Sequence, residues 1–482
     1  MAEILAALKS VVDALGATVL LPIIIFVIAL VLGARPGRAF RAGLTIGIAF
    51  IGINLVLGLM LTTLGEVAQA IVTNTGMQRD IVDVGWPSAA AIAFGSSVGL
   101  WVIPLGILVN VALLFSGLTR TLNVDVWNFW HFAFVGSLVV AATGSLGMGL
   151  LAAALMAALS LVLADWTAKG VQRFYGVPGV SVPHLASAQI VPLAILLNWI
   201  LDRIPGVNRI RVDTETVQRR LGVFGEPIVM GLAIGLVLGL VAYAGSADAG
   251  TVVTKSLQTG MNLAAVMLLL PRMVRILMEG LIPVSEAARD FVQKRAGDRE
   301  IHVGLDSAIL IGHPAAIASS LILVPIAILL SLVLPGNRII LFADLAVIPF
   351  VVAMAAPIVN GNVFRMVVIG TVTLVVGFYV GMALSPLMTT TAASSGFAIP
   401  ANATGITSVV DGFLYIPWVV IRLTQGLGLV GLLLVLGGVA ALLLAWRRAP
   451  RAMERLAGAD EPAPEAALPA TVAPGRPLAG RP

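Results

Sequence analysis

The sequence predicts an all-α, polytopic membrane protein, with about eleven transmembrane helices, re-entrant or broken segments and an internal repeat. Three observations lead to this fold class. The chain of 482 residues is 59% hydrophobic and 11% charged, whereas roughly a quarter of the residues in ordinary soluble domains are charged. Charge-free apolar runs of about 20 residues recur along the chain. The basic residues gather in short loops between these runs.

Each apolar run is long enough to cross the roughly 30 Å hydrocarbon core of a bilayer as a helix, which satisfies its backbone hydrogen bonds internally. The clearest runs lie at about 14–34, 43–64, 227–247 and 423–446. Longer, interrupted stretches count as one or two crossings each, which brings the total to about eleven. The first run has no convincing small-residue cleavage site, so we expect a retained helix rather than a signal peptide.

The basic loops predict the topology. They lie around 35–41, 203–220, 289–299 and 447–455, and the positive-inside bias places them in the cytoplasm. With an odd number of spans, the C-terminus is then cytoplasmic and the N-terminus lies outside. These loops also explain the formal net charge of +5, so we expect contact with membrane lipid and no nucleic-acid partner. The predicted location is the cell inner membrane.

Composition divides the chain into a membrane domain and a tail. We expect a transmembrane domain over 1–455, built from two repeat halves at about 14–200 and 203–446. Residues 456–482 are rich in Ala and Pro and offer no apolar face to bury. The sequence therefore predicts a disordered tail over 456–482.

Landmarks recur in the same order in the two halves. GLTIG at 43–47 returns as GLAIG at 231–235, and each opens an apolar span. A charge-free stretch from an aspartate to an arginine follows in each half, with a second aspartate beyond it. These residues are Asp83, Arg120 and Asp125 in the first half and Asp306, Arg338 and Asp344 in the second. The order favours duplication, and basic loops before both pentapeptides favour parallel over inverted halves.

Both charge-free stretches exceed about 30 residues, which is long for one untilted helix and short for two complete ones. Each contains Pro, Gly and Ser near its middle. This pattern predicts a re-entrant hairpin or a broken helix, and such breaks commonly form the substrate site in transporters. A pair of short, tightly turned spans stays open as the alternative.

Histidines in apolar surroundings are the first candidate site residues, because an ionisable side chain inside hydrocarbon costs a few kcal/mol. His184 lies after Pro183 with Gln189 nearby, and His313 follows Asp306 by seven residues. The third is His131, with aromatic and amide neighbours typical of sugar sites, Trp127 and Asn128. A hydrogen bond between packed helices, or an aromatic belt at the membrane interface, is the structural alternative for these residues.

Acidic side chains complete the candidates, because a carboxylate accepts two hydroxyl hydrogen bonds at once and so suits a polyol. Asp83 and Trp86 lie in VDVGWP, Glu226 in FGEP and Asp306 in GLDSA. Capping of a helix N-terminus explains Glu226 equally well. With no cysteine, four scattered histidines and no phosphate-binding loop, we expect no metal, no cofactor and no catalytic nucleophile in this chain.

Several rare strings give the chain a resemblance to a known family, the galactitol-type IIC component of the bacterial phosphotransferase system, in the ascorbate–galactitol superfamily. The resemblance covers about residues 10–450 and is weakest after Pro386. The strings are VDVGWP at 82–87, NVDVWNFWH at 123–131, Pro183/His184, IPGVNRI at 204–210, FGEP at 224–227, VMLLLPR at 266–272 and GLDSAILIGH at 304–313.

The resemblance implies a transport subunit that binds galactitol or a related polyol and presents it to a cytoplasmic IIB protein. The IIB phosphocysteine, recharged through a IIA protein, phosphorylates the polyol, so phosphotransferase activity belongs to the complex. The family also implies a homodimer with a substrate-holding core, which moves as an elevator against a scaffold. The alternative is an ion-coupled secondary transporter of the same fold for a polyol or an ascorbate-like substrate.

Overall fold

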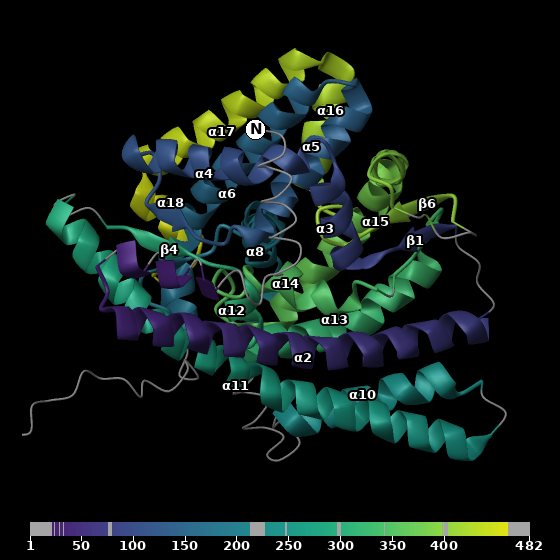
Figure 1. Ribbon diagram of the computed structural model, residues 1–482. Helices are drawn as coiled ribbons and strands as arrows, with labels where there is room; N and C mark the ends of the chain where they lie inside the picture. The colour runs from purple at the N-terminus through teal and green to yellow at the C-terminus, as the bar shows by residue number, and fades with distance from the viewer. Residues whose placement is uncertain are drawn as a thin grey trace, which may run out of the picture.

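The computed structural model describes residues 22–460 except 24, 28, 32, 76–79, 213–226, 246–247, 296–299, 342, 398 and 400–402. Helices form most of the described chain, and six strands of two or three residues connect them (Figure 1). The elements up to residue 209 are α2 (Pro36–Thr75), β1 (Ile81–Asp83), α3 (Gly85–Gly95), α4 (Gly99–Phe115), β2 (Thr121–Asn123), η1 (Trp127–Phe129), α5 (Trp130–Thr143), α6 (Leu146–Tyr175), β3 (Val180–Ser181), α7 (Leu185–Ala188), α8 (Val191–Leu201) and η2 (Val207–Arg209).

The remaining elements repeat much of this order. They are α10 (Pro227–Tyr243), α11 (Ala249–Arg295), β4 (His302–Gly304), α12 (Ala308–Ile311), α13 (Pro314–Val333), β5 (Ile339–Ile340), η4 (Leu345–Val347), α14 (Ile348–Ala353), α15 (Val363–Ser394), β6 (Gly405–Thr407), α16 (Tyr415–Leu427), α17 (Leu429–Arg448) and α18 (Pro450–Leu456).

Local sequence explains where the long helices begin and end. Ser145 caps α6, because its hydroxyl accepts a hydrogen bond from the Met148 N–H at 3.3 Å. Gly176 ends the same helix in the left-handed conformation, with φ of 68°. The Asn362 side chain caps α15 in the same way as Ser145 caps α6. The residues of α6 and α15 are mostly apolar, so forming these helices leaves few polar groups without partners.

Among the described residues, five helices are long and apolar enough to cross a membrane, namely α6, the Ala249–Leu269 part of α11, α13, α15 and α17. A sixth crossing is obtained if the α3–α4 pair counts as one span, and this pair bends by 88° at its break. The break lies inside the first charge-free stretch, where the sequence predicts a broken or re-entrant segment. The structure is therefore that of a mostly helical membrane protein, while the total of about eleven spans stays a prediction.

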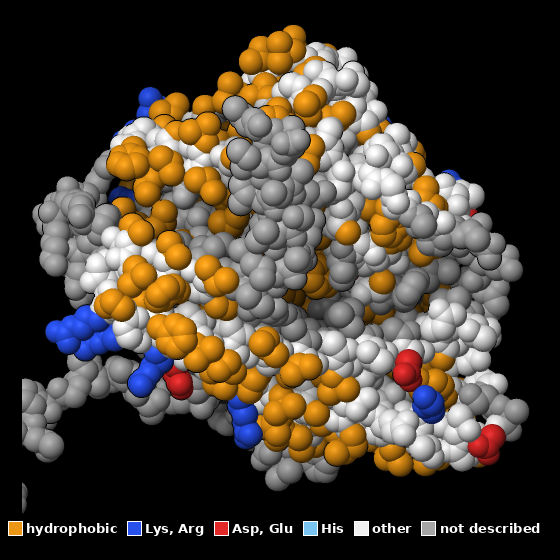
Figure 2. Space-filling view, viewed as in Figure 1, with side chains coloured by type: hydrophobic (Ala, Val, Ile, Leu, Met, Phe, Trp, Pro, Cys, Tyr) orange, Lys and Arg blue, Asp and Glu red, His pale blue; other side chains and the backbone are white. Residues whose placement is uncertain are grey.

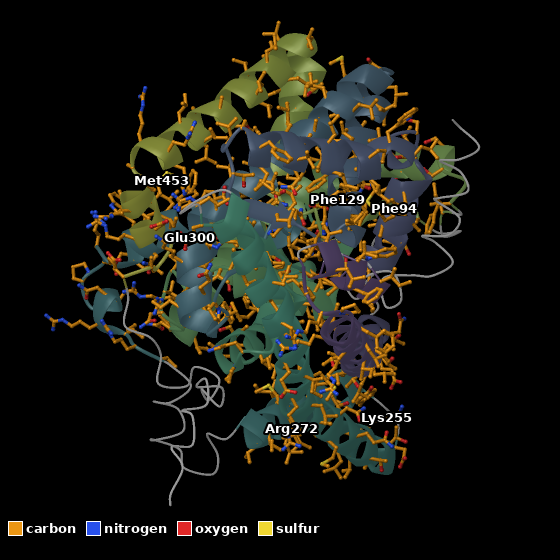
Figure 3. The ribbon with its side chains drawn as sticks, turned by 60° about the vertical axis from the view of Figure 1, so that its left-hand side comes forward. Phe94, Phe129, Lys255, Arg272, Glu300 and Met453 are labelled. Atoms are coloured by element: carbon orange, nitrogen blue, oxygen red, sulfur yellow. The ribbon has the colours of Figure 1, made fainter. Side chains whose placement is uncertain are left out.

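Helices α2, α10 and α11 pack on one another and form a layer along one side of the molecule (Figure 1). Lys255 and Arg272 lie on this layer, away from Phe94 and Phe129 in the main body (Figure 3). Apolar side chains cover much of its outer surface in Figure 2. Those exposed by about half or more are Phe40, Leu44, Ile48, Ile51, Leu55, Val237, Leu240, Val241, Val253, Leu257 and Met261. Such an apolar outer face suits contact with lipid or with another protein surface.

The six strands form two parallel sheets, each of which combines strands from both halves of the chain. Sheet A has the order β5-β1-β6, and sheet B has the order β2-β4-β3. The sheets lie towards opposite ends of the molecule, with α12, α14 and α8 between them (Figure 1). Because the strands within a sheet are parallel, their carboxyl ends meet at one edge, and this edge positions the polar residues described below.

The chain after the last long helix packs back on the body. The Trp166 Nε1–H donates to the Met453 carbonyl at 2.5 Å, and Arg173 donates to the Gly458 carbonyl at 2.7 Å. Ala457 is 1% exposed. The packed chain thus continues to Asp460, five residues beyond the boundary predicted from composition. The rest of the predicted tail lies outside the described residues.

Candidate functional site

Polar side chains gather where the strands of the two sheets end. Beyond the carboxyl ends of sheet B follow Asp125, Asn128, His184 and Asp306. At or beyond those of sheet A follow Asp83, Asp344 and Asp411. Helices of long apolar sequence surround both groups, so these side chains form a polar region inside an apolar body.

Three of these side chains, together with His131 of α5, form a chain of contacts that we call the polar centre: His131, His184, Asp306 and Asp411. His131 Nδ1 lies 2.6 Å from Asp411 Oδ2, and its Nε2 lies 3.2 Å from His184 Nε2. His184 Nε2 is 3.7 Å from Asp306 Oδ1. The exposed fraction of the side chain is 1% for His131 and 0% for Asp411, but 18% for Asp306. Asp306 is therefore the member of the polar centre most open to a ligand.

The contacts determine a consistent protonation pattern for the two histidines. The Ser187 backbone N–H donates to His184 Nδ1 at 3.3 Å, so His184 carries its proton on Nε2. That proton points to His131 Nε2, which accepts it. His131 is then protonated on Nδ1 and donates to the Asp411 carboxylate.

Neighbouring side chains hold the polar centre in place. The Asn128 amide donates to both carboxylate oxygens of Asp125, at 3.0 and 2.8 Å. The Gln189 amide donates to Asp411 Oδ1 at 3.2 Å, and the Ser187 hydroxyl donates to Ser307 at 2.8 Å. Ser187 and Ser307 belong to different halves of the chain, so their bond joins the halves beside His184.

Five residues singled out from the sequence thus meet in and around one place: His131, His184, Asp306, Asn128 and Gln189. Trp127 lies next to Asn128 in the chain and packs on Phe94, with ring centroids 5.6 Å apart. Its role in binding stays a prediction.

Asp83 and Trp86 belong to a second cluster, around Asp344. The Trp86 backbone N–H donates to Asp344 Oδ1 at 2.7 Å, and the Asp344 N–H donates to Asp83 Oδ2 at 2.8 Å. The Ser408 hydroxyl donates to Asp344 Oδ2 at 2.5 Å. Since Asp83 and Asp344 are at most 1% exposed, this cluster ties β1, β5 and β6 together rather than facing a ligand.

The last two candidates lie elsewhere. His313 packs against the rings of Phe174 and Tyr175, at centroid distances of 4.5 and 5.3 Å. Its Nδ1 accepts from the Ala315 N–H at 3.2 Å, which caps α13. This position fits the structural alternative for a histidine in an apolar helix. Glu226 lies outside the described residues.

Sequence reasoning missed Asp411, although it contacts both His131 and Gln189. Asp411 stands in VVDGF, with φ of 58°, a left-handed conformation that aspartate tolerates better than most residues. An aspartate followed by glycine within an apolar stretch was the available signal. Asp125 was noticed as a repeat landmark but not as a neighbour of Asn128.

The comparison with protein families identifies the chain. The family model EIIC-GAT, described as "PTS system sugar-specific permease component", matches residues 10–402. The chain belongs to the EIIC-GAT family. It is 39% identical over 437 residues to the PTS system galactitol-specific EIIC component of Escherichia coli strain K12, an alignment that covers 90% of this chain and 95% of that protein. The same figures hold for the galactitol-specific EIIC component of Escherichia coli O157:H7.

A putative permease IIC component of Escherichia coli strain K12 is 36% identical over 434 residues, which cover 90% of this chain and 97% of that protein. The resemblance noted from the sequence is thereby confirmed. The polar centre contains carboxylate acceptors and imidazole groups that accept or donate, and the amides of Asn128 and Gln189 lie next to it; these are the groups that form hydrogen bonds with hydroxyls. The family model and the galactitol-specific relative both concern the phosphotransferase system, which leaves the ion-coupled alternative without support.

Proposed function

We propose that this protein is the membrane translocation subunit of a sugar-alcohol phosphotransferase system, and that it binds galactitol or a related polyol at the polar centre. The observation that carries the proposal is the meeting of His184 and Asp306, one from each half of the chain, next to His131 inside an apolar body. Groups of this kind are costly at membrane depth unless they serve a ligand or one another. Asp306 is open enough to accept hydrogen bonds from substrate hydroxyls.

The proposed division of labour leaves the phosphorylation chemistry to partners. The chain contains no cysteine, so no thiol of its own can carry a phosphoryl group. A cytoplasmic IIB protein carries phosphocysteine and transfers its phosphoryl group to the bound polyol, and a IIA protein recharges IIB. The permease contributes binding, orientation and passage through the membrane, and phosphotransferase activity arises only in the complex.

The proposed topology has about eleven spans in the inner membrane and a cytoplasmic C-terminus. Arg447 and Arg448 lie in the last turn of α17, and Arg451 and Arg455 follow in α18. Four arginines directly after a span favour the cytoplasmic side, because basic residues close to a span are retained there. The end of the molecule that carries α18 and sheet B would then face the cytoplasm.

We further propose that the two halves are a repeat. The series from β1 to α6 and the series from β4 to α15 run through equivalent elements: strand, helix, helix, strand, 3₁₀ turn, helix and long helix. Exchanging each strand for its counterpart in the other half (β1 with β4, β2 with β5, β3 with β6) converts the order β5-β1-β6 into β2-β4-β3, which is the order of sheet B. Arg120 and Arg338 also match, since their carbonyls accept from the first residues of β4 and β1. Duplication accounts for all three correspondences.

The layer of α2, α10 and α11 supports a scaffold role. Its outer face is apolar, and its helices pack mainly on one another. We propose that this layer forms the homodimer contact and that the body with both sheets is the moving core. Cross-linking of purified protein through cysteines introduced at Leu55 or Val241 is expected to yield dimers. Dimers that form only through α17 would contradict this assignment.

Uptake by intact cells tests the main proposal. Cells that express this permease with its cognate IIB and IIA proteins are expected to accumulate labelled galactitol, arabitol or xylitol as the phosphate ester, and to take up no ascorbate. Cells without IIB are expected to accumulate none. Accumulation of unphosphorylated polyol without IIB, driven by an ion gradient, would refute the proposal.

A further inference from the structure

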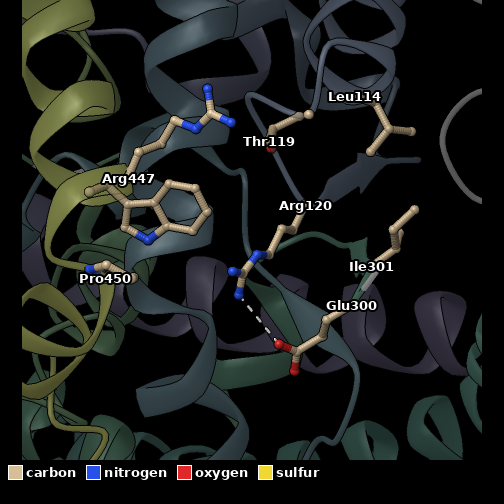
Figure 4. A pocket seen from close by; sticks show the side chains of 9 residues that line it. Leu114, Thr119, Arg120, Glu300, Ile301, Arg447 and Pro450 are labelled. Atoms are coloured by element: carbon tan, nitrogen blue, oxygen red, sulfur yellow. Dashed lines mark hydrogen bonds and ion pairs between the residues drawn. The ribbon is translucent and has the colours of Figure 1, made fainter. Parts of the chain in front are cut away.

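A second site lies at the opposite edge of sheet B from the polar centre. A cavity of about 390 Å³ opens there, in the size range of small-molecule sites. Arg120 and Glu300 face each other on one side of it, with Arg447 and Pro450 across from them (Figure 4). Its full lining is Leu114, Gly117, Thr119, Arg120, Glu300, Ile301, Trp446, Arg447 and Pro450.

The lining has the chemistry of an anion site. Two guanidinium groups, from Arg120 and Arg447, border the cavity. Arg120 also lies over the Trp446 ring at 5.1 Å, which fixes the plane of its fork of donors. The Trp446 Nε1–H itself is closed to solvent, so the donors that the cavity offers are those of the two arginines.

The second half of the chain provides an internal comparison, because Arg338 occupies the position in sheet A that Arg120 occupies in sheet B. Arg338 donates to both carboxylate oxygens of Asp80 and to the Thr404 hydroxyl. Among the described residues, Arg120 makes one long side-chain hydrogen bond, of 3.4 Å, with Glu300, and the two side chains are 38% and 49% exposed. Within that part of the chain, three hydrogen bonds hold the Arg338 guanidinium, whereas one holds that of Arg120 beside the cavity.

Sheet B connects this cavity to the polar centre. Arg120 directly precedes β2, which leads to Asp125 and Asn128, and Ile301 directly precedes β4, which leads to Asp306. Three residues of strand span about 10 Å. The cavity thus lies on the α18 side of the polar centre, about one short strand away.

We propose that this cavity binds the phosphate group of a phosphorylated polyol, on its way from the site of phosphorylation to the cytoplasm. The phosphate oxygens replace the Glu300 carboxylate on Arg120, in the bidentate geometry that guanidinium and phosphate share, and Arg447 supplies further donors. The substrate is a neutral polyol and the product a dianion, so a separate cationic site favours release of product over its return. This inference rests on the proposed function.

Binding of sorbitol 6-phosphate to the purified full-length protein, measured by calorimetry in detergent, tests the inference. Wild-type protein is expected to bind this ester and to bind sorbitol without the phosphate at least tenfold more weakly at this cavity. Arg120→Gln and Arg447→Gln are each expected to weaken binding by about tenfold or more, and Glu300→Gln to strengthen it severalfold. Arg338→Gln is the matched control, with wild-type affinity expected. Equal affinity in all five proteins would overturn the inference.

Galactitol binding distinguishes a failure of this inference from a failure of the proposed function. Galactitol binding by the Arg120→Gln and Glu300→Gln proteins is expected to equal that of wild type, because neither side chain contacts the polar centre. If the wild-type protein binds galactitol but does not bind sorbitol 6-phosphate, the proposed function stands and this inference is wrong.

A phospholipid headgroup presents the same phosphate chemistry, so the protein is also tested in nanodiscs. Ester binding is expected in nanodiscs of phosphatidylcholine and in nanodiscs containing phosphatidylglycerol. If the ester fails to bind, and Arg120→Gln instead reduces the retention of phosphatidylglycerol on the purified protein, the cavity is a lipid site and the inference is wrong. Should Arg120→Gln lower the melting temperature, the Arg447→Gln and Glu300→Gln proteins decide the outcome, because both side chains are surface residues.

Discussion

Replacing Asp306 by asparagine tests the polar centre most directly. Asparagine keeps the size of the side chain and an oxygen that accepts from the Ala308 N–H, now at 2.9 Å. What disappears is the negative charge next to His184, at 3.7 Å in the wild type. The Asp306 side chain is 18% exposed, whereas those of its neighbours in the polar centre are almost fully buried. The substitution therefore changes the part of the centre that a ligand can reach, with little loss of packing.

The expected loss of affinity follows from the type of hydrogen bond. A hydrogen bond to a charged group contributes about 1.5–3 kcal/mol, and one between neutral groups about 0.5–1.5 kcal/mol. Replacement of a carboxylate acceptor by an amide acceptor therefore costs roughly 1–1.5 kcal/mol for each hydroxyl bound, which is about a tenfold loss of affinity. Two hydroxyls on the same carboxylate would double the free-energy loss.

His184→Ala is a less selective change than Asp306→Asn. His184 accepts from the Ser187 N–H at the start of α7 and contacts His131, so its removal leaves buried polar groups without partners. We expect His184→Ala to weaken binding and also to lower the melting temperature. Asp306→Asn is expected to weaken binding with an unchanged melting temperature.

The assay is equilibrium binding of labelled galactitol to purified protein, together with a thermal-shift measurement with and without ligand. His313→Gln is the control, because His313 caps α13 and packs on Phe174 without contacting the polar centre. It is expected to melt at a lower temperature and to bind with normal affinity. An Asp306→Asn protein that binds galactitol as tightly as wild type would refute the placement of substrate at the polar centre.

Three further predictions concern stability. Hydrogen bonds from Arg338 and Thr404 hold the pKa of Asp80 well below its ordinary value. The exposed Asp80–Arg338 ion pair therefore stabilises the fold by no more than about 1 kcal/mol. This stabilisation is present above about pH 4 and is lost as the pH falls through the lowered pKa of Asp80. The melting temperatures of wild type and Arg338→Gln should therefore differ at pH 7 and converge in acid. Truncation after Asp460 should leave melting and uptake unchanged, whereas truncation after Arg455 should lower the melting temperature, because it removes the packed segment; equal melting of the two would contradict the packing. Asp411→Asn should lower the melting temperature, because His131 and Gln189 contact different carboxylate oxygens and the amide places an NH₂ donor against one of them; unchanged melting would count against that network.

The sequence predicted several individual residues of the candidate site but not how they are arranged. His131, His184 and Asp306 stood out because a titratable group among apolar residues needs a reason, and the structure brings these three together. His313 met the same criterion and serves packing instead. No property of the sequence near either kind of histidine separates the two, because the difference lies in whether a second polar chain segment arrives beside it.

Composition by itself determined the class of this protein, because the length of an apolar run and the absence of charge are local properties that suit a helix in lipid. The positions of the broken segments followed in the same way from Pro and Gly. Tertiary structure alone decided the two sheets, whose strands of two or three residues carry too little pattern to be recognised and pair with partners more than 100 residues away, such as Ile81 with Ile339. It also brought Asp411 to His131 across 280 residues. Contacts between distant segments depend on how whole helices pack, and that information is absent from any short stretch of sequence.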